Sequence, residues 1–146
     1  NYFQWDVAEE QAHLVRFFKR MIALRQEKAC LRRRDWMDGE TIQWHGNKVL
    51  QPDWSDASRL VCFSIGADLY AAFNASHEPT IVELPVLEEG MSWAMVVDTA
   101  ADEDGLASCA DDVEENPRVY LDQGYVALAP YSAIIAEGVQ RRGKEK

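Results

Sequence analysis

The sequence predicts a mainly β protein: an antiparallel β-sandwich preceded by one long amphipathic helix. Apolar residues recur at the helical period only up to about residue 28. Beyond residue 35 they form short runs of strand-forming residues separated by turn formers. No helical pattern stands between these runs, which is typical of antiparallel sandwiches and barrels. With 146 residues and 47% hydrophobic content, the chain can bury one ordinary core.

A helix is predicted from Val7 to Lys28. Asp6 and Glu9 stand three residues apart at its start, which is the spacing of a capping box. At about 100° per residue, its apolar residues cover roughly half of the circumference. These residues are Leu14, Val15, Phe17, Phe18, Met21, Ile22 and Leu24. So wide a face suits a helix between two layers, one of them outside this chain; it also suits a helix packed only on its own domain.

Six or seven short strands are predicted after the helix. Their ranges are Thr41–His45, Arg59–Ile65, Leu69–Phe73, Thr80–Leu84, Met91–Val97, Gly124–Leu128 and Ser132–Ala136. The third and fourth ranges are joined by the turn formers Asn74 to Pro79. They are therefore predicted to pair with each other as an antiparallel hairpin at the centre of the fold.

Three tryptophans are informative by their position. Trp44 and Trp93 fall within apolar strand runs and are predicted to lie in the core. Trp54 lies in a loop beside Pro52 and Asp53 and is predicted to be exposed. Since an aromatic ring can stack on the apolar face of a glucose ring, Trp54 is the candidate substrate-binding residue.

The charge is divided unevenly along the chain. Residues 1–34 carry eight Lys and Arg against four Asp and Glu, giving +4, while residues 35–146 carry seven against twenty-one, giving −14. The acidic majority repels phosphate backbones, so nucleic acid is not an expected partner. The sequence has no run of about 18 apolar residues, so no membrane-spanning helix is predicted. An acidic insertion around residues 99–117 is predicted to be a solvated loop, because DEDGLASC lacks the ligand spacing of an EF-hand.

The sequence contains no complete catalytic constellation, so no catalytic residue is assigned. His45 and His77 have no Ser or Cys partner in a nucleophile motif, and each is predicted to be a structural or surface histidine. The cysteines, Cys30, Cys62 and Cys109, show no CxxC spacing. Neither a zinc site nor a disulfide framework is expected from them, and no metal or cofactor is predicted.

A series of short motifs runs through the chain in a characteristic order. It comprises NYFQWD at the start, ALRQEKACLRR at the end of the helix, then IQWHG, PDWSDASR, AAFNASHEPTIVELP and SWAMVVDT. In this order the motifs resemble the C-terminal part of isoamylase-type starch debranching enzymes of plants and green algae. The resemblance extends from Asn1 to about Thr99. The start at Asn1, without Met, suggests a fragment or a processed chain.

The resemblance implies a place within the α-amylase superfamily, glycoside hydrolase family 13. Residues 1–29 would be the end of a catalytic (β/α)₈ barrel with its final helix, and residues 30–146 the C-terminal antiparallel β-sandwich. The family's nucleophilic Asp, general-acid Glu and third Asp lie in motifs upstream of the matching region. None of them maps onto this sequence, so the chain alone is expected to be inactive.

The resemblance also implies a function for the parent protein. It would hydrolyse the α-1,6 branch linkages of amylopectin or phytoglycogen in the stroma of the plastid (chloroplast). Its partners would be a branched α-glucan bound through the barrel, the remainder of the barrel, and isoamylase subunits in a homo- or hetero-oligomer. The alternative is a non-catalytic accessory module for subunit association or α-glucan binding, in which Trp54 would contact the glucan.

Overall fold

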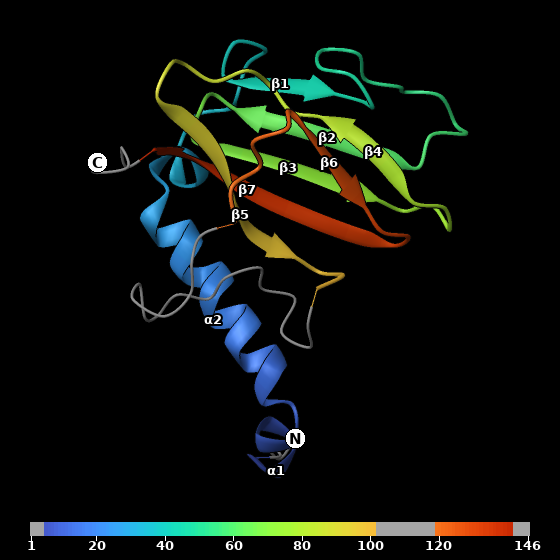
Figure 1. Ribbon diagram of the computed structural model, residues 1–146. Coiled ribbons are helices and arrows are strands. Elements are labelled where there is room, and N and C mark those ends of the chain that lie inside the picture. Colours follow the sequence, from blue (N-terminus) through green and yellow to red (C-terminus); the bar gives the residue numbers. More distant parts are fainter. Residues whose placement is uncertain (1–4, 102–118, 142–146) are drawn as a thin grey trace, which may run out of the picture.

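The computed structural model describes residues 5–101 and 119–141 (Figure 1). Most of the acidic insertion predicted around residues 99–117 lies outside this range, so its prediction as a solvated loop is not tested. Two helices, α1 (Trp5–Glu10) and α2 (Ala12–Glu27), are followed by the 3₁₀ helix η1 (Ala29–Arg32) and then by strands. No helix among the described residues has the length and apolar character needed to cross a membrane.

The strands form two antiparallel sheets, which confirms the predicted mainly β, sandwich-type fold. Within the described residues, a five-stranded sheet has the order β1-β2-β3-β7-β5, and a two-stranded sheet pairs β4 with β6. The strands are β1 (Ile42–His45), β2 (Leu60–Ile65), β3 (Leu69–Asn74), β4 (Thr80–Glu83), β5 (Met91–Asp98), β6 (Tyr125–Leu128) and β7 (Ser132–Gln140). All seven predicted ranges therefore coincide with a strand in position, and β3, β5 and β7 extend beyond their predicted ends.

The predicted central hairpin is wrong, because β3 does not pair with β4. β3 lies between β2 and β7, while β4 pairs with β6 in the other sheet. The side-chain amide of Asn74, at the end of β3, donates to the carbonyl oxygens of Glu78 and Ala129, each at 2.9 Å. These bonds hold the connection in a shape that carries the chain from one sheet to the other.

The single long helix predicted from Val7 to Lys28 is also wrong in part, because it is interrupted at Gln11. Gln11 has φ −104° and ψ 34°, outside the helical range, so α1 and α2 are separate helices. Among the described residues, the apolar side chains that pack on the sheet come from α2, beginning at Phe17. Because α1 contributes no side chain to this cluster, contact with the sheet does not hold α1 and α2 together as one straight helix.

Two apolar clusters lie on opposite faces of the five-stranded sheet. The first fills the space between the sheets and consists of Cys62, Tyr70, Ala72, Val82, Leu84, Trp93, Met95, Leu128, Ile134 and Ala136. The second joins the other face to the helices, and its buried members are Leu24, Cys30, Ile65, Leu69, Ala71, Val96 and Val97. The five-stranded sheet is thus the middle layer of the molecule.

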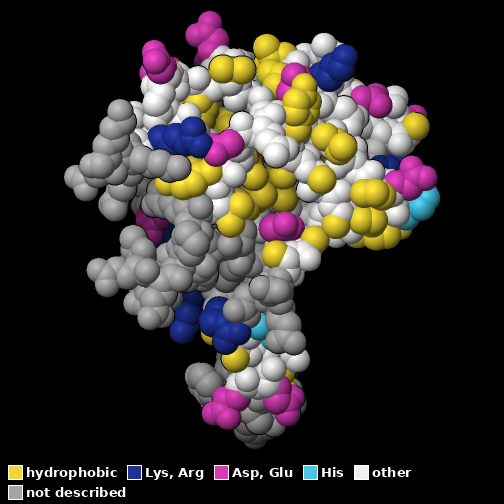
Figure 2. Space-filling model, in the orientation of Figure 1, with side chains coloured by type: hydrophobic (Ala, Val, Ile, Leu, Met, Phe, Trp, Pro, Cys, Tyr) yellow, Lys and Arg dark blue, Asp and Glu magenta, His cyan; other side chains and the backbone are white. Residues whose placement is uncertain are grey.

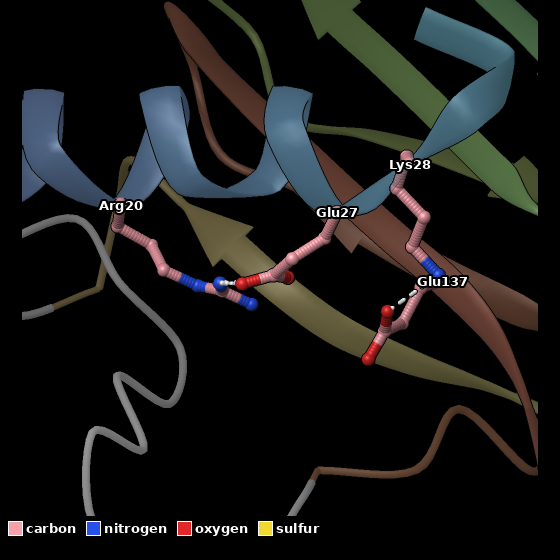
Figure 3. A network of polar contacts seen from close by, with 4 residues as sticks. All are labelled: Arg20, Glu27, Lys28 and Glu137. Carbon is pink, nitrogen blue, oxygen red and sulfur yellow. Dashed lines mark hydrogen bonds and ion pairs between the residues drawn. The ribbon is translucent and has the colours of Figure 1, made fainter.

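The C-terminal end of α2 is fixed to the sheet by charge as well as by packing. The Lys28 Nζ atom lies 2.7 Å from Oε2 of Glu137 on β7, and both side chains are largely shielded from solvent (Figure 3). Arg20 pairs with Glu27 along the helix itself, with Nη1 3.0 Å from Oε1. The rest of α2 extends away from the sheets (Figure 1).

Candidate functional site

Trp54, the predicted substrate-binding residue, lies in the loop between β1 and β2. The Asp53 carboxylate accepts a hydrogen bond from the Ser55 backbone N–H at 2.9 Å, which shapes the loop around Trp54. The Trp54 side chain is 66% exposed, so the prediction of an exposed ring is confirmed. Its role in binding glucan stays a prediction.

Trp44 was predicted to lie in the core, and this prediction is wrong. Trp44 pairs with Phe63 across β1 and β2, on the face of the five-stranded sheet that the helices cover only in part. Its side chain is 38% exposed and contacts Trp54 edge to face, with 5.4 Å between ring centroids. Trp93 is buried as predicted, and its Nε1–H donates to the carbonyl oxygen of Pro85 at 2.8 Å.

Apolar side chains continue from Trp44 across β2 and β3. The Trp44 and Phe63 ring centroids are 5.6 Å apart, and those of Phe63 and Phe73 are 6.3 Å apart. Val61 lies directly opposite Phe73 in the register. We call Trp44, Val61, Phe63 and Phe73 the aromatic strip. Except for the partly buried Phe63, its members are exposed. The sequence signal for the aromatic strip was the near-continuous apolar run in β2. Such a run indicates a strand that has apolar side chains on both faces and is covered on both.

A polar cleft opens between the two halves of the β1–β2 loop. It has a volume of about 380 Å³ and is lined by Gly46, Asn47, Lys48, Gln51, Asp53, Ser58, Arg59 and Leu60. Arg59 and Leu60 also line a second cleft of about 240 Å³, which reaches the β3–β4 connection at Asn74 and Thr80. Such amide, hydroxyl and charged groups can form hydrogen bonds to a neutral polyol.

The cleft does not have the chemistry of a glycosidase site. Hydrolysis of a glycosidic bond uses two carboxyl groups, one of which must be kept protonated. Among the described residues, Asp53 is the only carboxylate in the lining of the 380 Å³ cleft. Hydrogen bonds from Ser55 lower the pKa of Asp53, so this group is ionised near neutral pH and is not a proton donor.

His45 is buried at the end of β1 and has a structural role. Its Nδ1 atom accepts a hydrogen bond from the Leu50 backbone N–H at 3.0 Å, so Nδ1 carries no proton. Its Nε2 atom must then be protonated and donates to the Ser64 hydroxyl oxygen at 3.0 Å. Burial lowers the pKa of His45, which favours this neutral form. Leu50 has a φ of 58°, rarely adopted by leucine, and the His45 bond helps to hold it there.

The remaining residues considered for chemistry do not form a second site. His77 is exposed, and its nearest charged partner is Glu78 at 3.9 Å. Cys30 and Cys62 are free and buried, and burial raises the pKa of the Cys62 thiol to about 11. Within residues 5–101 and 119–141, no three His, Cys, Asp or Glu side chains come together as a possible metal site. Cys109 lies outside these residues.

Comparison with protein families and with individual proteins gives a consistent result. A family model described as the C-terminal domain of isoamylases 1 to 3 matches residues 43–136. The chain is 38% identical to the chloroplastic isoamylase SU1 of Zea mays, an alignment that covers 92% of this chain and 18% of that protein. The chain is 34% identical to the chloroplastic isoamylase 1 of Arabidopsis thaliana, with the same two coverages.

A more distant relative is the chloroplastic isoamylase 2 of Oryza sativa, which is 32% identical over 70% of this chain and 14% of that protein. The chain therefore spans less than a fifth of the length of the curated relatives it matches. The family match falls on the strands and loops described above, from β1 to β7, and includes the loop that carries Trp54. The chain belongs to the isoamylase family, and its residues 43–136 match the family's C-terminal domain.

Proposed function

We propose that this chain is the C-terminal part of an isoamylase that hydrolyses the α-1,6 branch linkages of amylopectin or phytoglycogen in the plastid stroma. The observation that carries the proposal is the alignment of 92% of the chain with chloroplastic isoamylases at 34–38% identity. The catalytic carboxyl groups would lie in the part of those proteins that the alignment does not reach. This chain would then stabilise the catalytic part rather than perform the chemistry.

The helices support a division of the chain at about residue 29. We assign residues 1–29 to the catalytic barrel as its final helix and residues 30–146 to the β-sandwich. Leu24 is the buried residue of α2, whereas Phe18 and Ile22 are 61% and 58% exposed. A helix with apolar side chains on two flanks suits a position between the sandwich and a second body.

A chimeric enzyme tests this function. The segment of the Zea mays relative that aligns with this chain would be replaced by residues 1–146, and release of linear chains from amylopectin would be measured. We expect debranching by the chimera, little or none by the same relative lacking the segment, and none by this chain alone. An inactive but folded chimera, or release of chains by this chain alone, would contradict the proposal.

A second candidate function is contact with α-glucan through Trp54. The exposed ring lies in the loop that also forms the 380 Å³ polar cleft, and glucan sites combine an aromatic face with hydrogen-bonding groups. Retardation of the chain in amylopectin-containing native gels would test it. Trp54→Ala should abolish the retardation, while Trp36→Ala, at a 99% exposed position, should keep it. Equal retardation of both variants would rule out Trp54.

Association with other isoamylase subunits belongs to the same proposal. β1 is an edge strand of the five-stranded sheet, and an edge strand can pair with a strand of another chain. Sedimentation velocity at increasing protein concentration should then give an increasing mass. A constant monomer mass would contradict association through this chain alone.

A further inference from the structure

Three connections lie at one end of the β-sandwich: the β1–β2 loop, the β3–β4 connection and the β6–β7 turn (Figure 1). The strand register shows the same arrangement. Leu60 at the start of β2 lies opposite Asn74 at the end of β3, and Asn74 lies opposite Ser132 at the start of β7. Lys28, which directly follows α2, contacts Glu137 toward the other end of β7. The loop end is therefore away from the point where the helix joins the sheet.

The two polar clefts lie side by side at this loop end. Arg59 and Leu60 line both the 380 Å³ cleft and the 240 Å³ cleft. The first cleft extends from these residues to Gly46, directly after β1, and the second extends to Thr80, the first residue of β4. Because they share two consecutive lining residues, the clefts form one channel across the loop end. We call it the loop-end groove.

Hydrogen bonds to the strands fix both walls of the loop-end groove. On one wall, the Asn47 carbonyl oxygen accepts from the Glu83 N–H at 3.0 Å, and the Asn47 side-chain amide donates to the Thr80 hydroxyl at 2.8 Å. On the other wall, the Arg59 carbonyl oxygen accepts from the Ala75 N–H at 2.8 Å. A groove that is already ordered loses little conformational freedom when a ligand binds. The walls are thus prepared for a ligand.

The Arg59 side chain is itself held in place where the two clefts meet. Its Nη1 atom donates to the carbonyl oxygens of Asp56 at 2.9 Å and Ser58 at 2.8 Å. A guanidinium also has N–H donors on Nε and Nη2. Within the part of the chain that the structure describes, these donors have no hydrogen-bond partner. Arg59 therefore has oriented donors available to a ligand in the groove.

The charges of the groove favour a neutral ligand. Among its described lining residues, Lys48 and Arg59 are balanced by Asp53 and Glu78. Figure 2 likewise shows Lys or Arg and Asp or Glu side chains interspersed on the visible face of the loop end. Such a mixture gives no net attraction to an anion or a cation. A sugar hydroxyl both donates and accepts hydrogen bonds, so it can use cationic, anionic and amide groups alike.

We propose that the loop-end groove holds an unbranched segment of α-glucan, and that Arg59 donates hydrogen bonds to it where the two clefts meet. This inference deepens the second candidate function, contact with α-glucan near Trp54, and rests on it. A chain of several glucose units is favoured over a single sugar because polar groups continue beyond Arg59 to Ser76 and Thr80 in the second cleft. Longer chains should therefore bind more tightly.

An NMR titration of this chain with maltotriose and maltoheptaose tests the proposal. The chain contains two buried apolar clusters of its own, so it is titrated as a folded domain. We expect maltotriose to shift amide signals of the first cleft, such as that of Gln51, and maltoheptaose to shift those of Ser76 and Thr80 as well. The Kd for maltoheptaose should be about tenfold lower, because a few additional hydrogen bonds suffice for such a gain.

A pair of variants tests whether the second cleft supplies this gain. Ala57 is exposed and lines only the second cleft, so Ala57→Phe should fill that cleft. The variant should keep the wild-type Kd for maltotriose and lose most of the tenfold gain for maltoheptaose. Ala100→Phe is the matched control, because Ala100 is exposed and lines neither cleft. It should change neither Kd.

Other outcomes overturn the inference. Equal Kd values for the two sugars, or equal changes of both in Ala57→Phe, would mean that the second cleft takes no part and would leave only a contact near Trp54. Displacement of maltoheptaose by inorganic phosphate would identify an anion site instead. Binding of neither sugar would refute the groove together with the Trp54 contact. Debranching by the chimera is measured separately, so that part of the proposed function would stand.

Trp54→Ala distinguishes the groove from the exposed ring. If the ring and the groove act together, this variant should weaken the binding of both sugars by a similar factor. A tenfold gain for maltoheptaose that survives Trp54→Ala with unchanged Kd values would reject Trp54 as a glucan contact and support the groove alone. Loss of all binding in Trp54→Ala, with no effect of Ala57→Phe, would assign the glucan to the ring and overturn the groove.

Discussion

A single residue at the end of β1, His45, makes the stability of the fold sensitive to pH. His45 is neutral in the folded state because Nδ1 accepts from Leu50 and because burial lowers the pKa of His45. In the unfolded chain its pKa is about 6.5. The unfolded state therefore binds more protons below that pH, and stability is lost as the pH falls from about 6.5 toward the lower folded pKa.

We expect the free energy of unfolding to decrease between pH 7.5 and 5.5, by at most about 1.4 kcal/mol per pH unit for one proton. Urea denaturation at several pH values would measure it. In His45→Gln, which cannot titrate, the slope over this window should be smaller. A wild-type chain that becomes more stable as the pH falls through 6.5 would contradict this account.

The close approach of the Gln51 backbone explains why the WHG motif has a glycine at Gly46. A Cβ atom at this position would lie 2.2 Å from the backbone carbonyl oxygen of Gln51, where the loop closes on itself. Gly46→Ala should therefore destabilise the chain by about 1–3 kcal/mol, as overpacking usually does. Gly39→Ala is the matched control, because nothing lies within 4 Å of its Cβ position. Similar urea midpoints for the two variants would show that the loop can move aside.

At the scale of elements, α2 has two apolar flanks with different roles. Leu24 is buried against the sheet, so Leu24→Ala should cost about 2–4 kcal/mol in the isolated chain. Ile22 is exposed, so Ile22→Ala should change stability by less than about 0.5 kcal/mol there. Thermal unfolding of both variants measures the difference. Equal losses would mean that both flanks of the helix are covered within this chain.

The elements also show how far the sequence determines the fold. Strand positions follow from local patterns of strand-forming and turn-forming residues, and every predicted range overlaps a strand. Strand pairing depends on contacts between distant residues, such as the bond from Asn74 to Ala129, which local patterns do not contain. The hairpin between Leu69–Phe73 and Thr80–Leu84 was predicted from proximity in sequence, whereas the actual partner of β4 is β6.

The same distinction applies to the candidate site. Trp54 was predicted to be exposed because loop composition is local information, and this was correct. Trp44 was assigned to the core because apolar strand residues are usually covered. Whether a sheet face is covered depends on how far α2 and its neighbours extend over it, and that is a property of the whole assembly.

At the scale of the whole molecule, the core between the sheets should make unfolding cooperative. Leu128 of β6 packs with Tyr70 of β3 and Trp93 of β5, so residues of both sheets share one cluster. Leu128→Ala should destabilise the chain by about 2–5 kcal/mol. The urea midpoint of unfolding should decrease by the same amount whether it is followed by far-ultraviolet or by near-ultraviolet circular dichroism. Separate midpoints would show that the two-stranded sheet unfolds independently.

The position of β7 has a consequence for synthesis on the ribosome. β7 is the last strand among the described residues, yet it lies between β3 and β5 and pairs with both. Until Ser132–Gln140 has left the exit tunnel, β1 to β3 can associate, but β5 has no place in their sheet. A nascent chain stalled before this strand would expose the apolar residues of β5, and would be a substrate for chaperones and proteases rather than a partly working domain.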